Sequence, residues 1–338
     1  MTYFPEIDIF ENELIQKYEG VLEQLLRDHT TEQNIFWATD NYERLGAEYS
    51  YHAQITKDLI SGVNGSVIMP RVKKDKELQQ VRSRSMAEVF TPSWICNAQN
   101  NLIDTAWFGK KNVFNKEIVK KDGTRTWQVN KNKIIFPENK NWRKYILDTR
   151  LEIACGEAPY ITSRYDTTNG QYIPVEKRIG ILDRKLRVVS ENVEESGKWL
   201  EAAQDAYKKT YAYEWQGDSL LLAREAMLMT FIENYALKFG KEPLTKSIKY
   251  IAYIISWNTW QMDGIKGVIP NSCMAVQEGT GNLFRNDDIP LQHCTGCKTG
   301  NINLHNGIYS LIKDWYVKDK STGKKGRKIK FASLIQKH

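Results

Sequence analysis

The sequence lacks the features that mark membrane-spanning and secreted proteins. No apolar run approaches the roughly 18 residues that a transmembrane helix needs. The five cysteines are odd in number and follow no secretory signal, which indicates a reducing compartment rather than a disulfide framework. We therefore expect a soluble, cytoplasmic protein without a membrane partner.

A large excess of charge is also missing. The chain has 48 Lys and Arg residues against 41 Asp and Glu, which gives a net charge of +7 and a pI near 8.9. This modest excess favours a phosphate-rich partner without requiring one. A length of 338 residues with 41% hydrophobic content allows a large core, in one large domain or two.

The rest of the chain is arranged around residues 149–165. A short apolar run with one acid, Glu152, breaks at Cys155 and Gly156. A buried strand that ends in small residues and leads into a helix is typical of the ligand crevice of open α/β sheets. Gly156 allows close approach of a ligand, and Pro159 suits a first helical turn. This pattern predicts a nucleotide-like ligand.

The letters Leu-Glu-Ile-Ala-Cys-Gly-Glu-Ala-Pro-Tyr, which end at Tyr160, resemble the first S-adenosylmethionine-binding motif of amino-group DNA methyltransferases, Asp-Pro-Ala-Cys-Gly-Thr-Gly-Gly-Phe. Glu152 stands for the acid of that motif, and residues 154–156 match it letter for letter. Glu157 and Ala158 depart from the usual Thr and Gly. The resemblance is closest to the adenine methylases of the restriction "subunit M" group, which have their target-recognition part downstream.

An upstream segment, Phe90-Thr91-Pro92, is similar to the Phe-Thr-Pro motif of the same family. In that family the loop lies over the methionine end of the cofactor and precedes the first motif, as it does here. Pro92 disfavours a helical Thr91, and we expect Thr91 or Ser93 to cap the helix that continues through Leu102.

A helix over 199–209 and a strand over 210–214 follow the first motif, and the strand ends in Glu214. A carboxylate at that position suits both hydroxyls of a ribose. Asp183 is a weaker candidate for the same role. The resemblance assigns Glu214 to the second motif and lays Trp215 against the adenine; the alternative is an acid that complements a helix dipole.

Further along, residues 257–264 read as a strand that leads into the turn Asp263-Gly264. The third motif of related methylases ends in such a pair, and its acid accepts a hydrogen bond from the adenine amino group. The alternative is an acid in a surface turn.

The fourth motif of the family, Asn-Pro-Pro-Tyr or a close variant, is missing because no two of the nine prolines are adjacent. In the family this segment holds the target amine and stacks on a flipped base. Asn271-Ser272 after Pro270 is a poor substitute. Residues 328–338 are similar to the segment that lies just upstream of the fourth motif, so the chain resembles the cofactor-binding half of a methyltransferase.

Four residues between 273 and 305 form a different constellation: Cys273, Cys294, Cys297 and His305. Thiolates two residues apart can bind one tetrahedral zinc ion, and a third cysteine or a histidine would complete the site. A reduced structural pair of thiols and a redox pair remain alternatives. Any zinc would be structural, since a sulfonium methyl donor needs no metal.

Two flanking regions complete the prediction. Spacings of three and four indicate an amphipathic helix over 8–28, and Lys120 to Thr124 predicts a hairpin turn in an insertion over about 107–140. The basic segment 71–76 is a solvated face or a phosphate-contacting arm.

We expect an α/β fold, a Rossmann-like methyltransferase sheet, with a helical N-terminal subdomain (1–85), a core (86–270) and a Cys/His-containing segment (271–338). The resemblance implies the S-adenosylmethionine-binding subunit of a split adenine-N6 DNA methyltransferase, whose second subunit carries the catalytic motif and target recognition and whose substrate is double-stranded DNA. An inactive methyltransferase-like binding protein of a restriction or defence complex is the alternative. A dinucleotide-dependent oxidoreductase is disfavoured because no Gly-x-Gly-x-x-Gly run follows the strand. The candidate cofactor-binding residues are Phe90, Thr91, Pro92, Glu152, Ala154, Cys155, Gly156, Tyr160, Glu214, Trp215 and Asp263.

Overall fold

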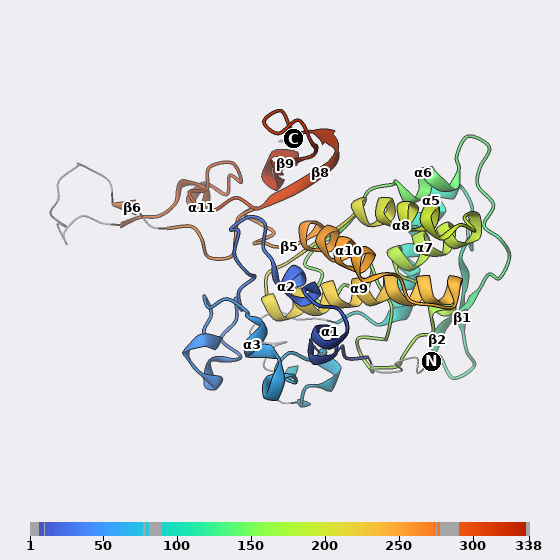
Figure 1. The fold of residues 1–338 in the computed structure, drawn as a ribbon, viewed down its shortest axis with the longest axis horizontal. Coiled ribbons are helices and arrows are strands. Elements are labelled where there is room, and N and C mark those ends of the chain that lie inside the picture. Colours follow the sequence, from blue (N-terminus) through green and yellow to red (C-terminus); the bar gives the residue numbers. More distant parts are fainter. Residues whose placement is uncertain are drawn as a thin grey trace.

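The computed structural model describes residues 7–9, 11–76, 79–80, 90–274, 276–277 and 291–335 (Figure 1). Its α-helices are α1 (Glu11–Lys17), α2 (Val21–Leu26), α3 (Lys57–Ile60), α5 (Ser93–Phe108), α6 (Trp142–Ile146), α7 (Ile181–Asn192), α8 (Ser196–Lys208), α9 (Gly217–Phe239), α10 (Thr245–Asn258) and α11 (Thr295–Thr299). Its strands are β1 (Asn115–Val119), β2 (Arg125–Val129), β3 (Arg150–Glu152), β4 (Thr210–Glu214), β5 (Thr259–Gln261), β6 (Val276–Gln277), β7 (Leu291–Gln292), β8 (Leu311–Lys318) and β9 (Lys325–Lys330). Short 3-10 helices lie at Glu43–Leu45, Ala47–Tyr49, Gly62–Asn64, Arg71–Lys73, Val175–Lys177 and Phe331–Leu334.

A small parallel sheet of order β3-β4-β5 lies at the centre, so the fold is mixed α/β. The chain passes from β3 to β4 through α7 and α8, and from β4 to β5 through α9 and α10. Parallel neighbours require such long crossovers, and helices supply them. All three carboxyl ends therefore meet at one edge of the sheet. Glu152 and Glu214 are the last residues of β3 and β4 there, and residues 153–156 and Asp263 follow the ends of β3 and β5.

The two faces of the sheet are covered differently. Helices α9 and α10 contact β4 and β5 on one face. On the other face, Tyr213 and Trp260 form a small apolar cluster with Ile312 of β8, and Phe331 packs against it. The β8–β9 hairpin, red in Figure 1, thus covers only the β4 and β5 side.

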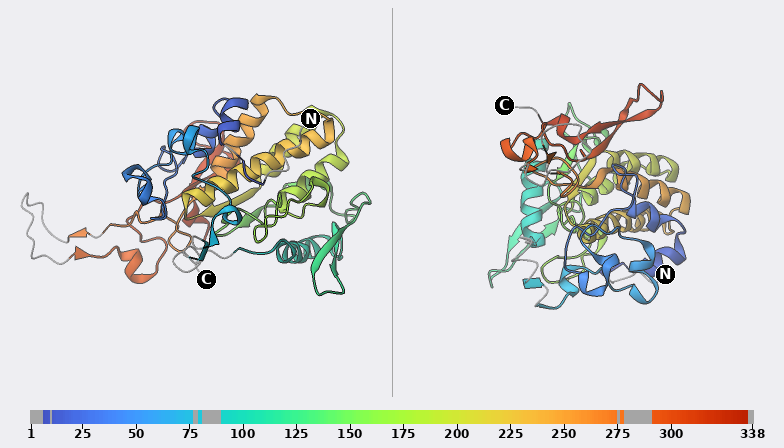
Figure 2. Two further views of the ribbon diagram at one scale, coloured as in Figure 1. Left: turned by 90° about the horizontal axis from the view of Figure 1, so that it is seen from below. Right: turned by 90° about the vertical axis from the view of Figure 1, so that its left-hand side faces the viewer.

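The largest core is helical, and α9 lies at its centre. Almost every residue of α9 from Gly217 to Tyr235 is buried, and the long helices run side by side in Figure 2. Buried Arg224 donates to the carbonyls of Arg27 and Thr259 at 3.1 and 2.8 Å, and also to that of Leu25. This one guanidinium joins the N-terminal helices to the start of β5.

Two local predictions are wrong. The predicted helix over 8–28 is two helices, α1 and α2, because Gly20 adopts a left-handed φ of 74° and breaks the pattern. The predicted helix start at Pro159 is a series of turns, and the next helix begins only at Ile181. Phe10 is one of the apolar residues of the helix predicted over 8–28, and it lies outside the described residues.

Other local predictions are confirmed. The hairpin β1–β2 turns through 120–124 with Gly123 at a φ of 83°, and strand β4 covers the predicted 210–214. The C-terminal hairpin β8–β9 was not foreseen. No helix among the described residues is long and apolar enough to cross a membrane.

Candidate cofactor-binding site and metal cluster

The turn after β3 has an unusual backbone. Ala154, Gly156 and Ala158 all have positive φ, at 45°, 53° and 56°. Two of the three are not glycine, and left-handed alanine stores strain that neighbouring contacts must offset. If residue 156 carried a Cβ atom, no heavy atom of the described residues would lie within 4 Å of it, apart from those of the residues next to it in the chain. The backbone at Gly156 is therefore open to a ligand.

Glu152 holds this turn together from inside. Its carboxylate accepts the backbone N–H groups of Tyr160 at 3.3 Å and Ile161 at 3.0 Å. The side chain is buried, and loss of solvation raises the pKa of Glu152 to about 8, with nearby Glu214 contributing. Glu152 thus shapes the loop rather than facing solvent.

Glu214 connects the turn to the end of β4. Its Oε2 accepts the N–H of Gly156 at 2.7 Å, and its Oε1 accepts those of Trp215 at 2.8 Å and Gln216 at 3.2 Å. Burial raises the pKa of Glu214 as well. Neither Glu152 nor Glu214 forms an ion pair with any residue in the described ranges. Two carboxylates therefore share a poorly solvated site to which the described residues contribute no ion-paired cation.

Cys155 lies between these acids but offers no reactivity. Its N–H donates to the carbonyl of Tyr213 at 3.0 Å, which continues the β3–β4 pairing. Burial raises the pKa of the Cys155 thiol well above its usual value. A thiol that stays protonated is a poor nucleophile, so Cys155 fills space under the turn.

The loop at 90–93 lies beside the same turn. The hydroxyl of Thr167 donates to the carbonyl of Thr91 at 3.2 Å. Burial raises the pKa of Tyr160, and the nearby Cys96 raises it further. A hydrogen bond with the Thr91 side chain lowers it. The guanidinium of Arg71 lies 4.8 Å from the centre of the Phe90 ring. The two segments that resemble the family are therefore adjacent, although about sixty residues separate them in sequence.

The prediction that the side chain of Thr91 or Ser93 caps α5 is wrong. No side chain of Thr91 or Ser93 caps the helix; Pro92 occupies the N-cap position. Asp166 instead accepts the N–H of Ser93 at 2.8 Å. A residue 73 positions away leaves no local signal in the sequence, so this contact could not be predicted.

Trp215 belongs to a polar chain that reaches the N-terminal region. Its indole Nε1 donates to the hydroxyl of Tyr51 at 3.0 Å, and the amide of Asn271 donates to the same hydroxyl at 2.9 Å. Sequence reasoning missed Tyr51. The edge of Trp215 is fixed by this contact while the side chain stays partly exposed.

Asp263 is used by its own turn. Its Oδ1 accepts the N–H groups of Ile265 at 3.0 Å and Lys266 at 3.1 Å, and its Oδ2 lies 3.4 Å from the Lys266 ammonium. Gly264 is required here, since a Cβ would stand 2.5 Å from the Tyr213 ring. Asp263 is therefore a buried acid that holds its own turn, rather than an acid in a surface turn, and it lies just after the end of β5.

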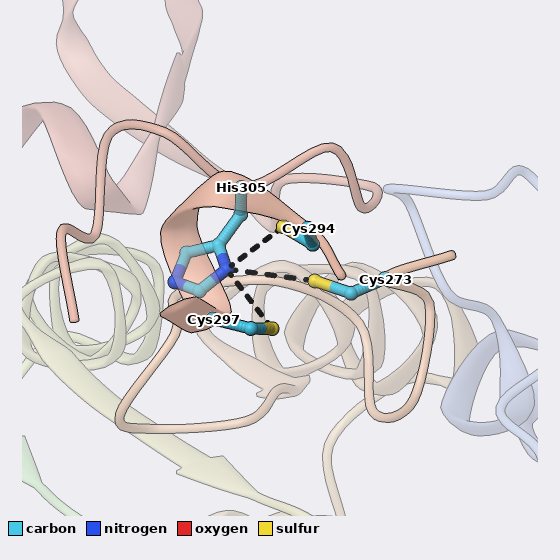
Figure 3. A group of neighbouring side chains, drawn as sticks. All are labelled: Cys273, Cys294, Cys297 and His305. Atoms are coloured by element: carbon cyan, nitrogen blue, oxygen red, sulfur yellow. Dashed lines mark hydrogen bonds between the residues drawn. The ribbon is translucent and has the colours of Figure 1, made fainter. Parts of the chain in front are cut away.

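The four residues Cys273, Cys294, Cys297 and His305 converge on one point (Figure 3). The three sulfur atoms lie 3.5, 3.6 and 3.7 Å from Nδ1 of His305, and all ligand atoms lie within 4.8 Å of one another. Zinc bonds of about 2.3 Å to sulfur and about 2.0 Å to nitrogen set a tetrahedral S···N edge of about 3.6 Å. The cluster has the donors and spacing of a tetrahedral metal site.

The surroundings of the cluster suit thiolate ligands. The N–H of Asn306 donates to Sγ of Cys294 at 3.2 Å, a contact that stabilises negative sulfur. Gly296 is required by packing, because a Cβ there would stand 2.6 Å from the His305 ring. His293, which flanks the pair, is not among the clustered residues. Sequence spacing alone did not decide between the two histidines.

Known proteins add nothing to this geometry. Comparison with protein-family models, with curated proteins and with solved structures finds no match to the chain. The function is therefore inferred from the two sites themselves.

Proposed function

We propose that this chain binds S-adenosylmethionine as one subunit of a split adenine-N6 DNA methyltransferase, on a Rossmann-like sheet. The observation that carries the proposal is the 2.7 Å hydrogen bond from the N–H of Gly156 to Glu214. It joins the small-residue turn after β3 to the acid at the end of the adjacent parallel strand. Crevices of this kind, at the carboxyl ends of open α/β sheets, are where such ligands bind.

Charge favours this cofactor over a dinucleotide. S-adenosylmethionine has a sulfonium, an ammonium and a carboxylate and so carries a net positive charge, whereas a dinucleotide carries a negatively charged pyrophosphate. Burial raises the pKa of Glu152 and of Glu214, and neither has a cation from the described parts of the chain, so a cationic ligand would stabilise their ionised forms. An anionic ligand would destabilise those forms.

Each residue of the site has a proposed role. Glu214 has a free lone-pair position beyond its three backbone donors and would accept a ribose hydroxyl. Gly156 offers open backbone, and Thr91 lies over the turn. Trp215 would lie against the adenine, and Asp263, beside it, would accept from the adenine amine. The bound cofactor supplies an electrophilic methyl group.

The need for a second chain follows from the target amine. Its lone pair is delocalised into the adenine ring, so it needs aligned acceptors and a stacking surface before it can attack a methyl group. The chain has no adjacent prolines and so no segment of that kind. The exposed Asn271 donates to Tyr51 and is not followed by an aromatic ring.

The sheet offers a place for the second chain. Within the described residues β3 pairs with β4 alone, so its other edge is free. Leu151 and Ile153, on the face that carries Tyr211 and Tyr213, are 44% and 65% exposed because the β8–β9 hairpin does not reach them. A strand of the partner chain that carries the Asn-Pro-Pro-Tyr segment would extend the sheet here and cover both side chains.

We further propose that the Cys/His cluster holds a structural zinc ion. Three thiolates and one imidazole form a closed four-ligand set with no open position for a substrate. The ion would join Cys273, which follows the turn that contains Asp263, to residues 294–305. Val268, in that turn, bridges to Tyr309, just after His305.

The test of the proposed function is transfer of labelled methyl from S-adenosylmethionine to unmodified genomic DNA. We expect no transfer by residues 1–338 alone, and transfer when the product of the neighbouring reading frame is co-purified with it. Efficient transfer by the chain alone would contradict the two-chain account. Cofactor binding without transfer in any combination would favour the alternative, an inactive methyltransferase-like binding protein.

A further inference from the structure

A large cleft begins beside the loop at 90–93 and extends along the β1–β2 hairpin. It is bounded by the start of α5, the β1–β2 hairpin, the loop at 166–178, helix α7 and the end of α9. Figure 2 shows the hairpin projecting at this end of the molecule. The cleft has a volume of about 1760 Å³, whereas pockets for small molecules have about 300–1,000 Å³. Its size suits a segment of a polymer.

The cations of this cleft fall into two groups. The first group is paired with carboxylates: Arg178 with Glu233, Arg184 with Asp104, Arg187 with Glu191 and Lys238 with Glu194. The second group is exposed and forms no ion pair within the described part of the chain; it consists of Lys120, Arg125, Lys131 and Lys177. These four are available to an anionic ligand.

The acids of the cleft do not cancel this charge. The lining carboxylates are Asp166, Asp183, Glu176 and Glu191. Asp166 and Asp183 are buried and accept backbone N–H groups, and Glu191 pairs with Arg187. Only Glu176 among these is exposed. The accessible side chains are therefore positive in balance.

Aromatic rings line the cleft together with these cations. Trp94, Trp127 and Tyr172 line the cleft and are partly exposed. The guanidinium of Arg125 lies 4.6 Å from the centre of the Trp94 ring. The indole of Trp127 donates to the carbonyl of Lys177 at 2.7 Å, which holds the hairpin against the loop and fixes the ring.

We propose that this cleft binds single-stranded nucleic acid. Unpaired cations would follow the phosphates, and fixed rings would stack on bases, which are exposed only when they are unpaired. A duplex keeps its bases covered and has no use for the rings. The cleft also adjoins the proposed cofactor site, because Pro92 and Ser93 line it. A strand bound here would lead toward that site.

The test is the fluorescence anisotropy of a fluorescein-labelled dT12 oligonucleotide titrated with residues 1–338 at low salt. We expect saturable binding that weakens with a log–log salt slope of about −3, since single strands give about −0.7 for each neutralised phosphate. The variant with Arg125→Glu and Lys131→Glu should weaken binding at least tenfold, and Trp127→Phe should bind better than Trp127→Ala. Lys110→Glu, an exposed change outside the cleft, is the matched control.

Several results would overturn this proposal. They are no binding at low salt, equal binding of a labelled duplex, or an equal loss in the Lys110→Glu control. Circular dichroism spectra and melting temperatures identify misfolded variants, which are then excluded from the comparison. The inference does not rest on cofactor binding, so calorimetry with S-adenosylmethionine on the same variants separates its failure from that of the proposed function.

Discussion

At the scale of single residues, Glu152 connects the strand, the turn and the chemistry. It is an acid in a place where a chain would ordinarily bury an apolar residue, and it satisfies two N–H groups of a turn with three left-handed residues. Burial raises its pKa from 4.5 to about 8. The folded protein therefore holds a proton there that the unfolded chain releases, and this contribution to stability is lost as pH rises through about 8.

The first prediction concerns this proton. Glu152→Gln keeps an acceptor but removes the titration, so the unfolding free energy of the variant should fall less than that of the wild type between pH 5 and pH 9. A shift of one pKa unit corresponds to about 1.4 kcal/mol, which makes the difference on the order of 4 kcal/mol. Urea midpoints at the two pH values measure it. Other buried acids contribute equally to both proteins, so identical pH dependence would remove Glu152 from this role.

The second prediction concerns Glu214. Glu214→Ala should weaken S-adenosylmethionine binding by about 1–3 kcal/mol, because it strands ribose hydroxyls and also frees the N–H of Gly156. Glu201→Ala, an exposed change on α8, is the control and should leave affinity unchanged. Calorimetry that finds equal affinity in a folded Glu214→Ala protein would show that Glu214 is not a ligand.

At the scale of elements, periodicity and turn chemistry predicted much of the fold. The residues of strand β4, of the β1–β2 hairpin and of most of α8 were sufficient to predict these elements. The single helix predicted over 8–28 is wrong because Gly20 adopts a left-handed conformation, which ends one helix even where the apolar spacing continues. The sequence also did not predict that the face of β3 that carries Leu151 and Ile153 is exposed. Leu151 and Ile153 look like core residues in any sequence, and only the reach of a distant hairpin leaves them exposed.

The third prediction uses that bare face. Leu151→Asp combined with Ile153→Asp should leave the melting temperature of residues 1–338 within a few degrees, since both side chains are largely exposed. The same change should abolish co-purification of the partner chain, because it places charge where a strand would pack. Val63→Asp, at a side chain that is 99% exposed in the N-terminal region, is the control. Retained association of the double variant would place the interface elsewhere.

At the scale of the whole molecule, three distant parts meet around the ends of the strands. The loop at 90–93, the turn after β3 and the end of β4 come together, and Tyr51 reaches the same region from the N-terminal part. The family resemblance of the sequence predicted that the loop at 90–93, the turn after β3 and the end of β4 would lie together. It could not predict that Asp263 would be engaged by its own turn, since the same Asp-Gly letters serve both roles.

The fourth prediction concerns the segment from Cys273 to His305. Mass spectrometry of metals in protein purified without chelators should find about one equivalent of zinc, and Cys294→Ser should lose it. Cys96→Ala, at a buried cysteine outside the cluster, should keep it. Well under one equivalent in the wild type would support reduced thiols instead. Removal of zinc should leave cofactor binding largely intact, because the Glu214 site does not include the cluster.

The central claim is that the crevice formed by Glu152, Gly156 and Glu214 binds S-adenosylmethionine. Isothermal titration of the isolated chain with this cofactor tests it most directly. We predict one site per chain with a dissociation constant in the micromolar range, about −8 kcal/mol, with S-adenosylhomocysteine competing and NAD failing to bind. A folded protein that shows no saturable binding of either compound up to millimolar concentration, or that binds NAD instead, would contradict the account.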